Sequence, residues 1–249
     1  MSALILKIIA LITMTIDHIA VVFSLSDIFR CIGRIAFPLY ALMIVDGCNH
    51  LINDKKRFTR YLIKIGIMAV ISELAFDLCF YQTPFSSEMQ NQILQFFTYI
   101  LGIYICDYFR KPYISIGVWI IIIYINFVAR IGYFSAGIIY MLVMKYYLDH
   151  FMKKNSDTRL LFCFAAIFSL IMLEYTDSIF TYVNDSEMIL YYLKNIFRSL
   201  GGVNAYTLLA VPFLARYNGE YGPISPVFRK FYFYYYPLHL FILSLIQLF

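Results

Sequence analysis

The chain has 249 residues, of which 62% are hydrophobic and only 14% are charged, and its formal net charge is +5. Soluble domains contain about 45–50% apolar and about 25% charged residues, so this composition excludes an ordinary soluble enzyme and predicts an all-α, polytopic membrane protein. No polar stretch is long enough for a soluble domain, so we expect one membrane domain over residues 1–249 that binds no nucleic acid.

The apolar segments number about nine if each spans the bilayer with ~20 residues. Their expected cores are 3–24, 35–52, 61–81, 92–109, 113–129, 132–149, 160–174, 188–215 and 231–249. We expect the first to remain as a helix, because charged residues interrupt it and no small-residue cleavage site follows. The eighth is too long for one span and carries Lys194, Arg198 and Gly201-Gly202, which predicts an interfacial helix followed by a kinked span.

The first segment contains two adjacent ionisable residues, Asp17 and His18. Ionisable groups are costly in a bilayer and usually mark functional sites. Lys7 precedes His18 by eleven residues, so on a helix the two side chains share a face and lie about 16 Å apart along the axis. A purely structural interpretation stays open, in which Asp17 and His18 make a buried structural hydrogen bond and Lys7 extends to the membrane interface.

The connecting loops alternate in charge. Basic residues concentrate in 53–60, 110–111, 150–159 and 216–230, whereas 83–91 has no Lys or Arg and 174–187 is acidic. Short basic loops stay in the cytoplasm, so we expect a cytoplasmic N-terminus and an external C-terminus in a bacterial cytoplasmic membrane. The loop 27–34 would then face outward with Arg30 and Arg34, and arginines held against the orientation rule indicate an anionic ligand.

Polar residues in the second and third segments fall into two layers. Asp46 and His50 form an i,i+4 pair near the cytoplasmic end, and the next cations are Lys55, Lys56, Arg57 and Arg60. These cations either report only the topology or bind a polyanionic cytosolic cofactor. Glu73 and Asp77 lie one turn apart near the outer end, at a depth similar to that of Asp17 and His18.

The last segment places Pro237 two residues before His239, among several tyrosines. A neutral histidine can take a proton from an amine or hydroxyl and return it to a leaving group. Neighbours on a helix point about 100° apart, so Asp17 is expected to orient Thr13 or an arginine rather than His18. The five cysteines show no metal-ligand spacing, and we expect no metal site.

Taken in order, these motifs resemble the TraX family of membrane proteins, known for the conjugative-pilin acetylase. The matching stretches are KIIA at 7–10, IDHI at 16–19, FRCIGRIAFPLYALMIVDG at 29–47 with His50, Ser72-Glu73, Phe76-Asp77, Asn91, Phe97-Thr98, Gly102, Tyr217-Asn218-Gly219, Gly222 and YYYPLHL at 234–240. Residues 110–200 match weakly. The family usually has Glu where this chain has Asp46, and commonly an Asp-Tyr-Gly stretch where this chain has Gly132-Tyr133-Phe134.

The resemblance implies a membrane acetyltransferase that takes acetyl from acetyl-CoA. Wider transmembrane acyltransferases have a basic residue, ten residues and then His in their first helix, a spacing that Lys7 and His18 reproduce. We expect His18 as general base with Asp17 supporting it, and His239 as second proton carrier or thioester-polarising donor. The expected donor-binding residues are Lys7, Arg30, Arg34, His50, Lys55, Lys56, Arg57 and Arg60. The expected acceptor-binding residues are Asp46, Glu73, Asp77, Asn91 and Tyr236.

Two other functions remain open at this stage. The intramembrane carboxylates and histidines are also suited to a proton-coupled transporter, although no pair of matching broken helices is visible. A non-catalytic assembly factor with the same fold is the third possibility. Among acceptors, the sequence does not distinguish a peptide N-terminus, such as that of a pilin, from a cell-surface glycan or a lipid head group.

Overall fold

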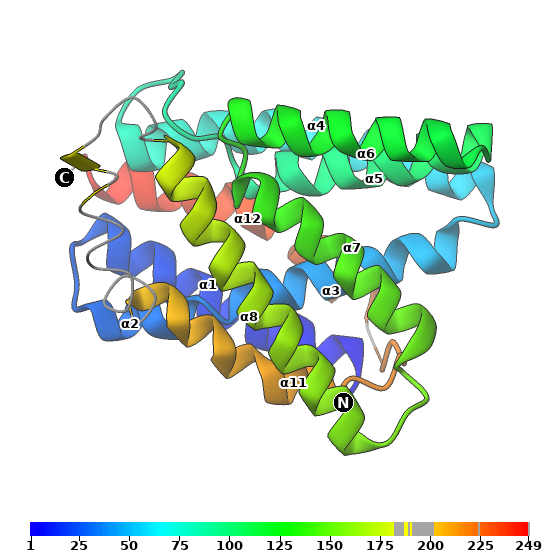
Figure 1. Ribbon diagram of the computed structural model, residues 1–249. Helices are drawn as coiled ribbons and strands as arrows, with labels where there is room; N and C mark the ends of the chain where they lie inside the picture. Colours follow the sequence, from blue (N-terminus) through cyan, green and yellow to red (C-terminus); the bar gives the residue numbers. More distant parts are fainter. Residues whose placement is uncertain (182–186, 189, 191–201, 224, 249) are drawn as a thin grey trace.

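The computed structural model describes residues 1–181, 187–188, 190, 202–223 and 225–248, and the elements found in them are helical (Figure 1). They are α1 (Ala3–Val22), α2 (Asp27–Gly33), α3 (Ala36–Leu51), α4 (Lys55–Tyr81), α5 (Gln92–Phe109), α6 (Pro112–Val128), α7 (Phe134–His150), α8 (Ser156–Thr181), the 3-10 helix η1 (Val203–Ala210), α11 (Val211–Ala215) and α12 (Pro226–Ile246). The predicted all-α class is confirmed.

Local sequence signals explain several helix boundaries. Asp54 caps α4 by accepting a hydrogen bond from the Arg57 backbone N–H at 3.1 Å, and Asn91 caps α5 in the same way. Ser225 caps α12, where Pro226 occupies the first turn and its missing N–H is not needed. These polar N-caps fix the residues at which the three helices begin.

Several stretches differ from the sequence prediction. Helices α4, α8 and α12 begin inside the expected basic loops 53–60, 150–159 and 216–230. Residues 27–34, expected as a loop, contain the short helix α2, whose first turn carries Asp27; acidic residues favour that position. Helix α8 continues to Thr181, so residues 174–181 of the expected acidic loop are helical. Of the eighth expected segment, 188–215, the structure describes residues 188, 190 and 202–215, and η1 and α11 form its second part. The interfacial helix expected in its first part falls largely outside the described residues.

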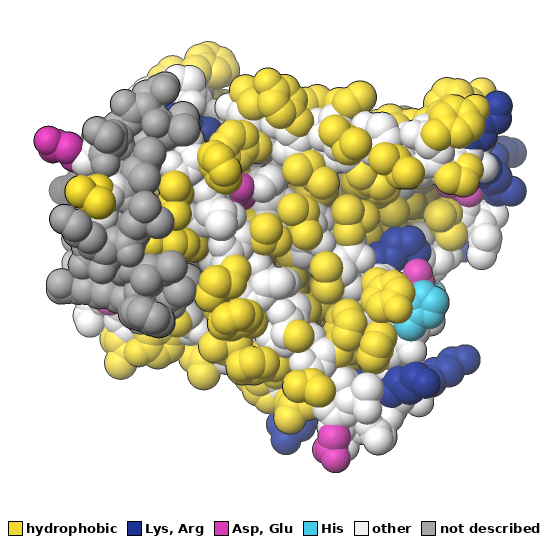
Figure 2. Space-filling model, in the orientation of Figure 1, with side chains coloured by type: hydrophobic (Ala, Val, Ile, Leu, Met, Phe, Trp, Pro, Cys, Tyr) yellow, Lys and Arg dark blue, Asp and Glu magenta, His cyan; other side chains and the backbone are white. Residues whose placement is uncertain are grey.

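Three helical stretches of the described chain are long and apolar enough to cross a membrane: Ala3–Val22, Asp27–Leu51 and Ser156–Asp177. Many apolar side chains of the other helices are exposed, such as Val70 of α4, which is 74% exposed, and Ile120 of α6. Figure 2 shows hydrophobic side chains over most of one face, with Lys and Arg gathered at one edge. A face of this kind suits lipid contact, but the count of nine spans stays a prediction.

The basic loops meet at one end of the molecule, which we call the basic end. The Met1 ammonium donates to the Arg216 carbonyl, and the His50 ring contacts the Tyr221 ring. Lys145, near the end of α7, donates to Asn49. In Figure 1 the N-terminus lies at this end and the C-terminus at the opposite one. This arrangement agrees with the predicted alternation of loops, while the side that faces the cytoplasm remains a prediction.

The opposite end, which we call the histidine end, is closed by paired loops. Gln90 forms an isolated bridge with Ile131 and accepts from the Gly132 N–H. Asp77 of α4 accepts from the Ser86 N–H at 2.9 Å. Helix α12 packs against both α4 and α1. This packing brings the first and last helices of the chain into one site.

Candidate active site

The two predicted histidines meet between α1 and α12. The His18 Nδ1 and His239 Nε2 atoms are 2.7 Å apart, and the two rings are nearly parallel, with an interplanar angle of 4°. His239 is only 6% exposed. The sequence separates these residues by more than 200 positions, so only the packing of the first helix against the last brings them together.

The hydrogen bonds of the pair assign its tautomers. The Nδ1 atom of His239 lies 2.9 Å from the Tyr235 carbonyl oxygen, which can only accept, so this nitrogen carries a proton. In two neutral rings, His239 Nε2 is then the acceptor and His18 Nδ1 the donor. The pattern leaves His18 Nε2 as the unprotonated nitrogen, which is the form that a general base requires.

Aromatic side chains enclose this pair. The Phe80 and Tyr236 rings meet the His18 ring edge-on, with centroid distances of 5.4 and 6.0 Å. The Tyr235 ring stacks on His239, and its hydroxyl lies 2.7 Å from Thr15 of α1. The aromatic residues before Pro237 therefore form walls around the histidines, and Pro237 itself lies inside α12.

Asp17 points to an arginine, which is one of the two alternatives that the sequence left open. Its carboxylate lies 3.4 Å from Arg34, and Arg34 also donates to the Tyr133 hydroxyl. A Cβ atom added to Gly33 would lie 2.2 Å from the Asp17 Cβ. Glycine at this position therefore allows α2 to approach α1 and the ion pair to form.

The predicted acidic residues of α4 have different surroundings. Glu73 accepts from both the backbone and the side-chain N–H groups of Asn91. Its other oxygen, Oε1, is buried without a hydrogen-bond partner. Asp77 instead anchors the 83–91 loop through Ser86. Glu73, Asn91 and Tyr236 thus join the histidine end, and Asp77 supports the loop over it.

At the basic end, a carboxylate and several tyrosines surround Lys7. Asp46 accepts from the Tyr217 hydroxyl at 2.8 Å and lies 3.5 Å from His50 Nδ1. The Lys7 ammonium lies over the Tyr232 ring, 5.2 Å from its centroid. Since Lys7 and His18 both contact α12, the predicted shared face is confirmed.

The loop residue Tyr221 completes this cluster, because its ring also meets Lys7, at 6.0 Å. Burial raises the pKa of Tyr221, and the nearby Asp46 carboxylate raises it further, because both disfavour the phenolate. The phenol is therefore protonated at neutral pH.

The eight expected donor-binding cations do not form one cluster. Arg30 and Arg34 belong to α2 and its end, with Arg34 beside Asp17, whereas Lys7 and His50 lie at the basic end. Near the N-terminus of α4, Lys55, Lys56, Arg57 and Arg60 are exposed. Arg57 pairs with Asp54 while remaining 71% exposed. The structure therefore separates a histidine end with two arginines from a basic end with the remaining cations.

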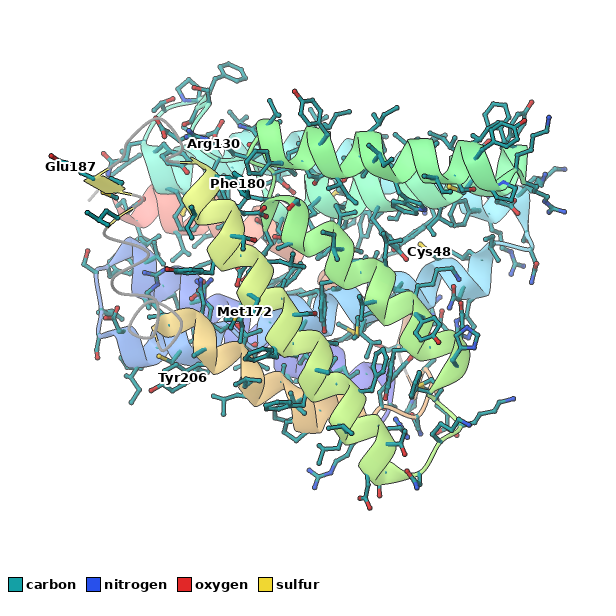
Figure 3. The ribbon with its side chains drawn as sticks, in the orientation of Figure 1. Cys48, Arg130, Met172, Phe180, Glu187 and Tyr206 are labelled. Atoms are coloured by element: carbon teal, nitrogen blue, oxygen red, sulfur yellow. The ribbon has the colours of Figure 1, made fainter. Side chains whose placement is uncertain are left out.

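Sequence reasoning missed several residues of these clusters. Tyr217 belongs to the family-like Tyr217-Asn218-Gly219 stretch, but nothing in the sequence predicted that its hydroxyl would bind Asp46. Nothing in the sequence predicted that Tyr232 would contact Lys7. Asp177 of α8 holds the start of α7, where Ser135 donates to it at 2.6 Å and the Ala136 N–H at 3.0 Å. This carboxylate lies close to Gly132-Tyr133-Phe134, where the family's Asp-Tyr-Gly carboxylate is missing. Figure 3 shows how densely side chains fill the space between the helices.

A comparison with family models identifies the chain. The model described as TraX protein matches residues 2–247. No curated protein and no solved structure gives a significant match. Because the family match covers nearly the whole chain, the chain belongs to the TraX family, and together with its apolar helices this makes it a membrane protein.

Proposed function

We propose that this TraX-family chain is a membrane-embedded acetyltransferase, in which His18 removes a proton from the acceptor. The observation that carries the proposal is the hydrogen-bond chain from the Tyr235 carbonyl through His239 to His18. A buried chain of this kind holds one imidazole in one tautomer with its free nitrogen available. A general base needs an unprotonated nitrogen in a defined tautomer, and this chain provides one at His18 Nε2.

The proposed reaction balances with the residues of this site. The acceptor N–H or O–H gives its proton to His18 Nε2 while its N or O attacks the thioester carbonyl carbon of acetyl-CoA. The tetrahedral intermediate collapses, the C–S bond breaks, and the departing thiolate takes the proton back from His18. The imidazolium formed in between keeps its hydrogen bond to His239 Nε2, so His239 is a positioning residue that also stabilises charge.

The acceptor is proposed to bind at the histidine end. Glu73 has a buried oxygen without a partner among the described residues, and the Tyr236 ring meets both histidine rings. A buried acceptor atom is costly until a donor reaches it, so an incoming amine or hydroxyl satisfies Glu73. Both a peptide N-terminus and a glycan provide such donors. Arg30 and Arg34 are proposed to bind negative groups near the same end.

The donor is proposed to approach from the basic end, which would face the cytosol of a bacterium. CoA carries phosphates, and multiple cations at one end of a membrane protein provide the charge that they need. The exposed cations at the start of α4 are available for this purpose, because Arg57 keeps most of its surface in solvent. Acetyl-CoA is then a co-substrate, and its thioester reaches the histidines inside the molecule.

The test uses purified protein in detergent or liposomes with acetyl-CoA labelled in the acetyl group. We expect free CoA thiol to appear together with labelled acceptor, when peptides with a free N-terminus and glycans with free hydroxyls are offered in separate reactions. Movement of protons or solutes without thiol release would instead favour the transporter. If neither thiol release nor transport occurs, while loss of the gene still impairs surface assembly, the chain is an assembly factor and the proposal is wrong.

A further inference from the structure

Two cations meet at the basic end of α1 and α12 without a carboxylate of their own. Lys7 is half-buried over the Tyr232 ring, and Arg229 lies one helical turn before Tyr232 on α12. Arg229 and Tyr232 are three residues apart and so lie on the same face of α12, which is the face that Lys7 contacts. Within the described part of the chain, neither side chain makes an ion pair or a hydrogen bond.

The carboxylate whose charge acts on Lys7 is already engaged with other residues. Asp46 is the acidic group whose charge acts on Lys7, but it already accepts from Tyr217 and faces His50. Two like charges held close together repel each other, and partial burial of Lys7 strengthens that repulsion. An anion placed between them relieves the repulsion and makes charge-assisted hydrogen bonds with both side chains. The pair therefore favours binding of a phosphate group.

The same two helices carry the histidine pair further along. Lys7 precedes His18 by eleven residues and Arg229 precedes His239 by ten, which correspond to about 16 and 15 Å of helix. Contacts at both levels, Lys7 with Tyr232 and His18 with His239, show that α1 and α12 run in the same direction side by side. The two helices thus hold a cation pair and a histidine pair at a matched separation.

We propose that Lys7 and Arg229 together bind a phosphate of the acyl donor and that the distance to the histidines selects donors by length. The fitting class is a phosphate-bearing thioester whose flexible arm spans about 15 Å between phosphate and acyl carbon. A short acyl phosphate cannot occupy both pairs at once, and a thioester without phosphate leaves the cations uncompensated. This inference rests on the proposed acetyltransferase function, because it assigns the acyl end to His18.

The test measures binding separately from catalysis. Calorimetry on the detergent-solubilised protein compares CoA, 4′-phosphopantetheine and pantetheine, the last of which has the arm without phosphate. We expect the wild type to bind both phosphate-bearing ligands at least tenfold more tightly than pantetheine. Lys7→Met and Arg229→Gln should each remove most of this preference, and the double variant all of it. Lys230→Gln is the matched control, because this neighbouring cation points about 100° away from Arg229 on the helix.

Kinetics supply the second arm of the experiment. In the same variants, KM for acetyl-CoA should rise about tenfold or more per cation while kcat changes less, and KM for acetyl-pantetheine should stay constant. Arg229→Gln is the safer variant for folding, because Arg229 is exposed.

Binding and kinetics together separate the two proposals. Retained phosphate preference in the double variant, or no CoA binding by the wild type, overturns the inference even where transfer is active. If phosphate-selective binding depends on the two cations but no acetyl transfer occurs, the phosphate site stands and the proposed acetyltransferase function fails.

Discussion

The histidine end and the basic end are built along the same two helices but have opposite environments. At the histidine end, His18 and His239 are held by short hydrogen bonds and enclosed by aromatic rings. At the basic end, His50 is 45% exposed on its side chain and pairs loosely with Asp46. An enclosed site whose groups are held by hydrogen bonds suits proton transfer, whereas an open site with exposed cations suits capture of a charged ligand. Changes at the first should lower kcat, and changes at the second should raise KM.

The largest expected effect is that of His18→Gln. Glutamine keeps a polar side chain but cannot act as a base near pH 7, so the transfer rate should fall about 10²–10⁴-fold while the detergent-solubilised yield stays nearly unchanged. The measurement is thiol release from acetyl-CoA with acceptor present. His150→Gln is the control, since His150 is an exposed residue at the end of α7. Wild-type rates in His18→Gln would remove His18 from the chemistry.

His239→Gln should have the next largest effect on kcat. The amide can still accept from His18 but holds its tautomer less strictly, so we expect a loss smaller than that of His18→Gln, with a shifted pH profile of kcat. Asp17→Asn should be milder still, because Asp17 faces Arg34 rather than the histidines. If His239→Gln is inactive while His18→Gln is active, the roles assigned to the two histidines are reversed.

Gly33→Ala tests whether the histidine end depends on close helix contact. The added Cβ would lie 2.2 Å from the Asp17 Cβ, so α2 must move away from α1, which typically costs about 1–3 kcal/mol. We expect a lower melting temperature in detergent and a reduced kcat. Gly117→Ala is the control, because a Cβ at Gly117 meets nothing within 4 Å. Equal melting temperatures for the two variants would contradict the contact.

At the basic end, Tyr217→Phe should raise KM for acetyl-CoA a few-fold and leave kcat almost constant. The change removes the hydroxyl that donates to Asp46, a bond to a charged group worth about 1.5–3 kcal/mol, and frees the carboxylate to oppose the donor's phosphates. Tyr124→Phe, on the exposed face of α6, serves as control. A fall in kcat without a change in KM would show that the two ends are not functionally distinct.

The smallest effect is expected for the double change of Arg57 and Arg60 to Gln. Both side chains are exposed, and Arg57 shares its charge with Asp54, so solvent screens their attraction for phosphate. KM for acetyl-CoA should still rise more than kcat falls, and the rise should shrink at high salt. Lys154→Gln in the 150–159 loop is the control. An unchanged KM would place the donor's phosphates elsewhere.

Much of the helix framework followed from the sequence. The predicted cores agree closely with α1, α3, α5, α6 and α7, because apolar runs bounded by polar caps and loop signals define helices locally. Residues 27–34 were predicted wrongly as a loop, because a seven-residue helix is too short to show a clear period. The end of α8 was also misassigned, since Asp177 and Glu174 indicated a polar loop, whereas Asp177 caps α7 inside the protein.

The sequence alone determined that the chain is an all-α membrane protein of the TraX type, that Lys7 and His18 share a face, and that Asp17 does not orient His18. These conclusions depend on composition, motif order and helix periodicity, which are local. Tertiary structure alone decided that His239 orients His18, that Asp17 pairs with Arg34, and that Lys7 lies over Tyr232 of the last helix. Those pairs connect distant segments, and their partners are set by the packing of α12 and α2 against α1, which no local pattern encodes.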